Sequence, residues 1–146
     1  MKSNGFTIIE LLIVVAIVGI IAAIAIGSYE GQTDVTYQSD AQSALLQFSN
    51  AMERSYTERT PSTYTGLAQG GNTGKPANFF TQTPIDGGTK MYNLTISAAT
   101  AAGYTLLATP IVGEKMAGTG RIELNSNGQR CWYSGADSTG GTCTEW

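Results

Sequence analysis

Phe6-Thr7-Ile8-Ile9-Glu10 begins the stretch of sequence that decides the fold, and an unbroken apolar run over residues 11–26 follows it. At about 1.5 Å rise per residue, a helix over residues 6–26 would be roughly 31 Å long, which matches the hydrocarbon thickness of a bilayer. Glu10 is the one charged side chain in that helix. Because an unpaired carboxylate near the centre of a spanning helix costs on the order of 2.5 to 3.5 kcal/mol, and less near an interface, Glu10 needs a positively charged partner.

The residues before the apolar run indicate where that partner comes from. The polar leader Met1-Lys2-Ser3-Asn4-Gly5 ends in a glycine before Phe6, and Glu10 is the fifth residue after that glycine. A cut between Gly5 and Phe6 would place a new α-amino group near Glu10 of the same chain or of a neighbouring copy. In these residues the chain resembles type IV prepilins and the related pseudopilins. The resemblance implies cleavage after Gly5 by a prepilin peptidase, N-methylation of Phe6, and a role for Glu10 in subunit recruitment and packing.

Two other interpretations of the N-terminus are open. An ordinary secretory signal would end at the small-residue triplet Ala23-Ile24-Ala25, and a plain membrane anchor would keep the whole apolar run. Glu10 argues against both interpretations, because a secretory signal and a plain membrane anchor each require an uninterrupted apolar segment. The mass of the mature N-terminus distinguishes the three interpretations.

Composition limits what the rest of the chain can do. Of the 146 residues, about 120 remain outside the leader and the apolar run, which is enough for one modest core. The formal charge of −3 argues against a general phosphate-binding surface. The chain has no histidine and two cysteines, so the usual zinc sites and histidine-assisted nucleophiles are excluded. We expect no enzyme activity, no cofactor and no metal, and one structural disulfide between Cys131 and Cys143.

The helix is expected to continue to residue 58, as one element over residues 6–58. Residues 27–36 are its weakest part, with two glycines and three β-branched residues in ten. Many members of the pilin family have a kinking proline where this chain has Gly27, so a fixed kink is not implied here. From Asp40 onward apolar side chains recur at helical spacing and should pack on a sheet, whereas Glu53 and Arg54 should face away. That apolar face consists of Ala41, Ala44, Leu45, Phe48, Met52 and Tyr56.

A long loop and four strands are predicted after the helix. Pro61 ends the helix, and residues 61–89 are rich in Gly, Thr, Asn and Pro, with Tyr64, Phe79 and Phe80 as aromatic anchors. Alternating apolar residues between turn signals then predict an antiparallel sheet. Its strands are expected at residues 91–97, 104–110, 120–125 and 129–133. The predicted fold class is therefore α+β, a long N-terminal helix packed on a four-stranded antiparallel sheet, as in type IV pilins.

This organisation divides the chain into three parts. Residues 1–5 are the leader, and residues 6–26 are the half of the helix expected in the membrane or in a filament core. Residues 59–146 and the second half of the helix are expected to form one globular domain. By resemblance, this domain lies in the periplasm or outside the cell, and the protein is a single-pass inner-membrane protein until it enters a surface pilus.

Several stretches after the leader resemble the minor pilins of type IVa pili. They include Met52-Glu53-Arg54-Ser55-Tyr56-Thr57, Asp86-Gly87-Gly88-Thr89-Lys90 and Gly128-Gln129-Arg130-Cys131-Trp132. The resemblance implies a structural subunit for pilus assembly or priming that supports twitching motility, adhesion or DNA uptake. Its partners would be other pilins, the prepilin peptidase and an inner-membrane assembly platform. A major pilin and a type II secretion pseudopilin are alternatives.

A second hypothesis is a DNA-binding pilin, because the same group includes receptors for natural transformation. Phosphate contacts require cations, and unpaired bases stack on aromatic rings. The candidate contacts are Lys75, Lys90, Lys115, Arg121, Arg130 and Trp132. Cations scattered over a solvated surface are the simpler interpretation of the same residues.

Overall fold

The computed structural model describes residues 6–146, except for the side chains of residues 27, 28 and 30. Its first element is the helix α1 (Ile8–Glu58), which continues without interruption through the glycine-containing residues 27–36. The chain forms two compact units, whose boundary lies within α1 between Thr36 and Tyr37. The first unit contains the apolar half of α1, and the second contains the remainder of the chain.

The second unit is built on a five-stranded antiparallel sheet in which each strand pairs with the next along the chain. The strands are β1 (Gln82–Thr83), β2 (Tyr92–Ala99), β3 (Tyr104–Pro110), β4 (Gly120–Asn125) and β5 (Arg130–Ser134). The four expected strands are all present, with bounds that differ by up to two residues. The prediction of four strands was one too few. β1 has only two residues, which is too short for the alternation that identifies a strand in a sequence.

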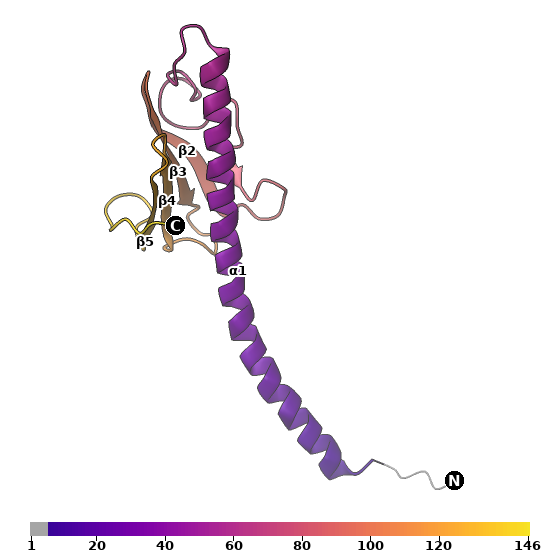
Figure 1. Cartoon of the computed structure of the whole chain (residues 1–146). Helices are drawn as coiled ribbons and strands as arrows, with labels where there is room; N and C mark the ends of the chain where they lie inside the picture. The colour runs from indigo at the N-terminus through magenta and orange to yellow at the C-terminus, as the bar shows by residue number, and fades with distance from the viewer. Residues whose placement is uncertain (1–5) are drawn as a thin grey trace. The chain divides into compact units, whose positions relative to one another are not determined.

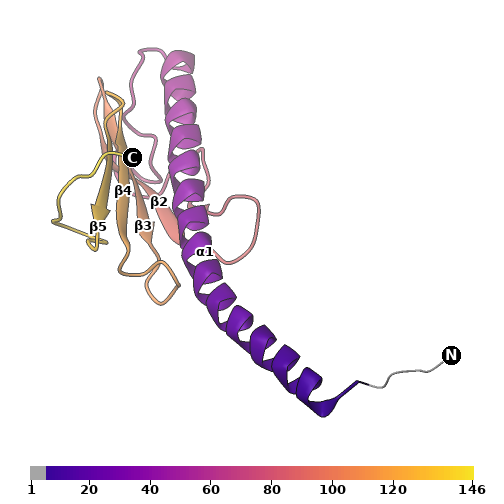
Figure 2. The same ribbon diagram turned by 60° about the horizontal axis from the view of Figure 1, so that its bottom comes forward.

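The core of this unit lies between the C-terminal half of α1 and one face of the sheet (Figures 1 and 2). The helix contributes the predicted apolar face, on which Ala41, Leu45 and Phe48 are almost completely buried. The sheet contributes alternate residues, such as Leu94 and Ile96 on β2 and Ile122 on β4. This agreement follows from geometry, because a period of 3.6 on the helix and of 2 on the strands brings apolar side chains to the shared interface.

The segment between α1 and β2 is attached to the helix by aromatic stacking. Phe79 stacks on Phe48 with ring centroids 4.9 Å apart, and Tyr64 stacks on Tyr56 at 4.4 Å. Phe80, expected to anchor this segment, instead remains 54% exposed and contacts Phe79 edge to face. Two of the three predicted anchors are thus buried or half-buried.

Glu53 joins α1 to this segment and to β3. Its two carboxylate oxygens accept hydrogen bonds from the hydroxyls of Tyr64 and Tyr104, each at 2.9 Å. Ser49 lies 2.8 Å from the Tyr104 hydroxyl and completes the chain of hydrogen bonds as the donor. Glu53 does lie on the exposed side of the helix as predicted, but its carboxylate turns back to bind the domain.

Burial shifts the acid–base behaviour of both tyrosines. Desolvation raises the pKa of Tyr64 to about 12, and the hydrogen bond to Glu53 acts in the same direction. Desolvation also raises the pKa of Tyr104 to about 12, with the Glu53 carboxylate adding to the effect and Ser49 opposing it. A phenolate beside a carboxylate is unfavourable, so both hydroxyls stay protonated and continue to donate.

Candidate functional site

The apolar half of α1 is a single exposed hydrophobic surface. Large aliphatic side chains between Ile8 and Ile26 are exposed on every side of the helix; Ile8, for example, is 81% exposed. The mean hydropathy of its most apolar part is 3.1, which makes the helix long and apolar enough to cross a membrane. A helix that is apolar all round belongs in lipid or among other apolar helices.

Thr7 and Glu10 cap the start of this helix. The backbone N–H of Glu10 donates to the Thr7 hydroxyl at 3.3 Å, and that hydroxyl donates to the Glu10 carboxylate at the same distance. The bond from the Glu10 N–H to the Thr7 hydroxyl is that of a helix N-cap. It is one half of a capping box, because here the carboxylate accepts from the Thr7 hydroxyl and not from the Thr7 backbone N–H. The spacing Thr-x-x-Glu before an apolar run is a signal in the sequence for such a cap. Our sequence prediction overlooked it and gave Glu10 only an assembly role.

The predicted processing site lies at the edge of the described residues. Gly5 is outside them, and Phe6 is highly exposed. The predicted cleavage between Gly5 and Phe6, the methylation of Phe6 and the register role of Glu10 therefore remain predictions. What the structure adds is that the Glu10 carboxylate sits on the first turn of α1, close in sequence to that site.

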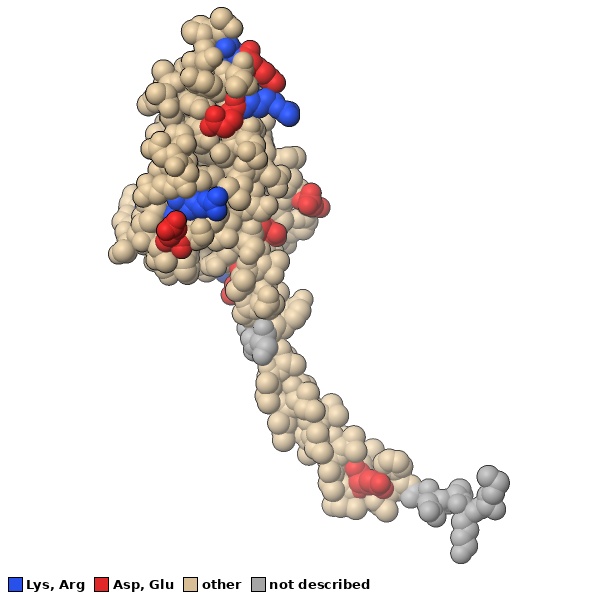
Figure 3. All heavy atoms as spheres, in the orientation of Figure 1, with Lys and Arg blue, Asp and Glu red and all other residues tan. Residues whose placement is uncertain are grey.

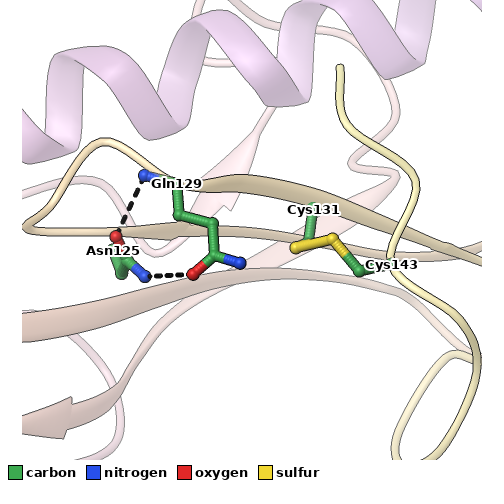
Figure 4. Close-up of a disulfide and its surroundings, with 4 residues drawn as sticks. All are labelled: Asn125, Gln129, Cys131 and Cys143. Atoms are coloured by element: carbon green, nitrogen blue, oxygen red, sulfur yellow. Dashed lines mark hydrogen bonds between the residues drawn. A yellow bond between two sulfur atoms is a disulfide. The ribbon is translucent and has the colours of Figure 1, made fainter.

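The C-terminal tail is attached to the edge strand β5. A disulfide joins Cys131 on β5 to Cys143 (Figure 4). The backbone of Trp132 pairs with that of Thr144 through two hydrogen bonds. Just before β5, the side chain of Asn125 closes the β4–β5 turn with hydrogen bonds of 3.0 Å to the side chain and to the backbone N–H of Gln129 (Figure 4). The tail thus covers the middle of a strand edge that would otherwise be open to another chain.

Two residues that our sequence prediction did not single out for this purpose also hold the tail. The Asp137 carboxylate accepts hydrogen bonds from the backbone N–H groups of Gly118 and Gly120, at 2.7 and 2.9 Å. Arg121 donates to the carbonyl of Gly140 at 2.9 Å and to that of Ala136 at 3.2 Å. No spacing in the sequence indicates these contacts, because they join segments that are 15 to 19 residues apart.

The structure does not bring the six candidate DNA contacts together. Lys90, Lys115 and Arg121 lie at the end of the sheet where β2 and β4 begin, whereas Arg130 begins β5 at the opposite end. Lys75 is exposed in the loop before β1. Trp132 packs against the core and is only partly accessible for stacking. The candidates therefore form at least two separate groups.

Several of these candidates already have partners within the domain. The ammonium group of Lys90 donates to the carbonyl of Pro84. The Arg121 guanidinium lies 3.8 Å from the centre of the Tyr133 ring, and that of Arg130 lies 5.3 Å from the Trp146 ring. On the face drawn in Figure 3, Lys and Arg side chains lie close to Asp and Glu side chains rather than in one basic patch.

Comparison with known proteins identifies the family. Residues 27–121 match the family described as "Type IV minor pilin ComP, DNA uptake sequence receptor". The chain belongs to the type IV minor pilins. Residues 1–26 match the "Prokaryotic N-terminal methylation motif". Together the two matches cover the leader, the helix, the strands β1 to β3 and the first two residues of β4, and they agree with the resemblance found in the sequence.

Individual relatives agree with this assignment, and a solved structure shares the fold. A "Fimbrial protein" of Pseudomonas aeruginosa is 47% identical over 55 residues, 38% of this chain and 36% of that protein. The "Type IV major pilin protein PilA" of Myxococcus xanthus is 41% identical over 58 residues, 40% of this chain and 26% of that protein. The chain thus matches about a third or less of the length of these relatives.

The crystal structure of the Neisseria meningitidis non-core minor pilin PilV superposes with a TM-score of 0.55 at 20% identity, covering 77% of this chain and 94% of that one. At that identity the likeness shows the fold, a long helix packed on an antiparallel sheet.

Proposed function

We propose that this chain is a subunit that is stored in the inner membrane by its N-terminal helix and then enters a cell-surface type IV pilus. The observation that carries the proposal is the exposed apolar surface over residues 8–26, which holds a single carboxylate. Lipid and a bundle of like helices are both apolar, so the helix can leave one for the other at small cost in hydrophobic free energy. The partners are other pilins, the prepilin peptidase and the inner-membrane assembly platform, with the globular domain outside the membrane.

In this proposal Glu10 sets the axial register of the subunit. After cleavage, the α-amino group of Phe6 on an adjacent subunit neutralises the Glu10 carboxylate among apolar helices, where an unpaired charge is costly. Replacing Glu10 with Gln removes the charge and keeps the cap, because the bond to the Thr7 hydroxyl comes from the backbone N–H of residue 10 and not from its side chain. We expect Glu10→Gln to insert into the membrane normally and to be roughly tenfold depleted from sheared filaments, measured by quantitative immunoblotting. Incorporation at the wild-type level would refute the register role.

The role within the pilus is inferred from the minor-pilin family. A minor subunit that primes or joins the fibre supports twitching motility or adhesion at low abundance. Mass spectrometry of sheared filaments gives the ratio of this chain to the other pilins. We expect a small fraction; a dominant subunit would instead indicate a major pilin, and absence from surface filaments would favour a type II secretion pseudopilin.

A second function, DNA uptake, is favoured by one specific observation. The family matched over residues 27–121 is described by its role as a receptor for DNA uptake sequences. The candidate contacts are Lys75, Lys90, Lys115, Arg121, Arg130 and Trp132, of which Lys75, Lys115 and Arg130 are exposed. Because the chain carries a net charge of −3, we propose local phosphate contacts rather than a basic face.

A salt series tests this function. Full-length protein in detergent micelles is titrated with duplex DNA, and the binding constant should fall with a log–log slope of about 0.9 per phosphate contact. The variants Lys75→Gln and Lys115→Gln should each weaken binding and reduce that slope by about one contact. Val112→Ala, which changes a 92% exposed uncharged residue, is the control and should bind as the wild type does. Absence of salt-dependent binding would rule out a receptor role.

A further inference from the structure

A groove on the globular domain combines an aromatic ring with polar and charged side chains. It has a volume of about 280 Å³ and is lined by Gln47, Asn50, Ala51 and Arg54 of α1 and by Phe79 of the loop before β1. The four helix residues follow one another at steps of three, one and three, so they share one flank of the helix. This volume is near the lower end of the range for small-molecule sites, which suits a single ring system.

The polar groups in this groove have few partners of their own. Within the described part of the chain, the side chains of Arg54 and Asn50 make no hydrogen bond or ion pair, and Gln47 has only a long contact of 3.4 Å with Ser43. Both Asn50 and Arg54 are exposed. The groove therefore offers a guanidinium and a carboxamide to a ligand without first breaking bonds inside the domain.

The aromatic wall of the groove is fixed in place. Phe79 is stacked on the buried Phe48, with ring planes 6° apart, and forms a T-shaped pair with Phe80. A ring that is already held by two neighbours loses little conformational entropy when a ligand packs against it. The small side chain of Ala51 keeps the floor of the groove open.

We infer that this groove binds one unpaired nucleobase of DNA together with its phosphate. The base packs against Phe79, Asn50 and Gln47 hydrogen-bond its edge, and Arg54 binds the phosphate, which are the contacts by which proteins recognise unpaired bases. The inference rests on the proposed DNA-uptake function, and it places an unpaired base on residues outside the six candidate contacts.

Charge at the far end of the same flank orients the ligand. A neighbouring hollow of about 150 Å³ shares Gln47 and contains the carboxylates of Asp40 and Asp86. Phosphate is repelled there, so the backbone of the strand lies at the Arg54 end and the base points toward Gln47. The groove thus has one favourable orientation.

The test compares single-stranded and duplex DNA of the same sequence, each labelled with a fluorophore and titrated against full-length protein in micelles by anisotropy. Arg54→Gln removes the charge, and Ala51→Leu keeps every charge but fills the floor. Each should weaken binding of the single strand roughly tenfold, which is the scale of one lost base contact, and should change duplex binding less than twofold. Lys75→Gln, which removes a charge outside the groove, is the matched control. It should change the affinities for single-stranded and for duplex DNA by the same factor. Asn50→Ala provides a further variant at an exposed position.

Each other outcome has a distinct meaning. Wild-type affinity of Ala51→Leu and Arg54→Gln for the single strand, with duplex binding intact, would overturn the groove and leave the receptor function standing. Equal losses in Arg54→Gln and Lys75→Gln, with none in Ala51→Leu, would also overturn it, because charge alone would explain them. Failure of the wild type to bind either form would overturn both proposals.

Discussion

At the scale of single residues, Thr7 and Glu10 place a helix cap and the carboxylate of the proposed register role in one turn of helix. The Thr7 hydroxyl accepts from the Glu10 N–H, and the Glu10 carboxylate is held beside it. Thr7→Val removes the cap and leaves the charge, so it should weaken the first turn by about 0.5 to 2 kcal/mol. We expect this variant to enter filaments at a level between those of the wild type and of Glu10→Gln. An equal loss in both variants would mean that the order of the first turn, rather than the charge, governs incorporation; the measurement is the same immunoblot of sheared filaments.

The tyrosines bound to Glu53 predict how stability depends on alkaline pH. An unfolded tyrosine titrates near pH 10, whereas burial raises the pKa of Tyr64 and Tyr104 to about 12. The folded state therefore holds its phenolic protons more tightly than the unfolded state does. Their contribution to stability is complete below pH 10 and is lost as the pH rises through 12. Denaturant midpoints measured across this window should decrease.

The control for this prediction is Tyr64→Phe combined with Tyr104→Phe. This variant cannot form either phenolate, so its midpoint should decrease less over the same pH window. It also loses two hydrogen bonds to Glu53, which costs about 0.5 to 1.5 kcal/mol for each at neutral pH. Parallel curves for the two proteins would show that other groups cause the alkaline loss.

At the scale of the elements, two glycines with opposite surroundings test how closely β4 and β5 pack. Gly120 begins β4 with a φ of +106°, and a Cβ there would lie 2.1 Å from the Tyr133 carbonyl oxygen. Gly31 is in α1, and a Cβ there meets nothing within 4 Å. Gly120→Ala should therefore lower the denaturation midpoint sharply, whereas Gly31→Ala should stabilise the helix by about 0.5 to 1 kcal/mol. A tolerated Gly120→Ala would show that the two strands can separate at this point without cost.

The same elements show how much of the fold could be predicted from the sequence. Periodicity identified the helix, its core face and four strands, because each has several residues in a repeating pattern. It could not identify β1, whose two residues form a strand only because Gln82 and Thr83 pair with Asn93 and Tyr92. The Glu53 hydrogen bonds and the Asp137 contacts also depend on the tertiary structure, since they join residues 11 to 51 positions apart. Of the candidate sites, the N-terminal motif could be recognised in the sequence because its residues are adjacent. The groove beside Phe79 could not be recognised, because its walls come from separate segments.

At the scale of the whole molecule, the two units have separate sources of stability. The unit Tyr37–Trp146 has its own core, whereas the helix before it exposes its apolar side chains. In the proposed function, lipid or neighbouring subunits cover that helix. A charge introduced at Ile17, which is 51% exposed, should therefore affect only one of the two units. We expect Ile17→Asp to impair membrane insertion, because an aspartate at the centre of a spanning helix costs about 2.5 to 3.5 kcal/mol, and to abolish entry into filaments. The denaturant midpoint and the protease resistance of the globular unit should remain those of the wild type. Unfolding of that unit in Ile17→Asp would mean that the apolar helix supports its fold directly, which the burial of its core does not predict.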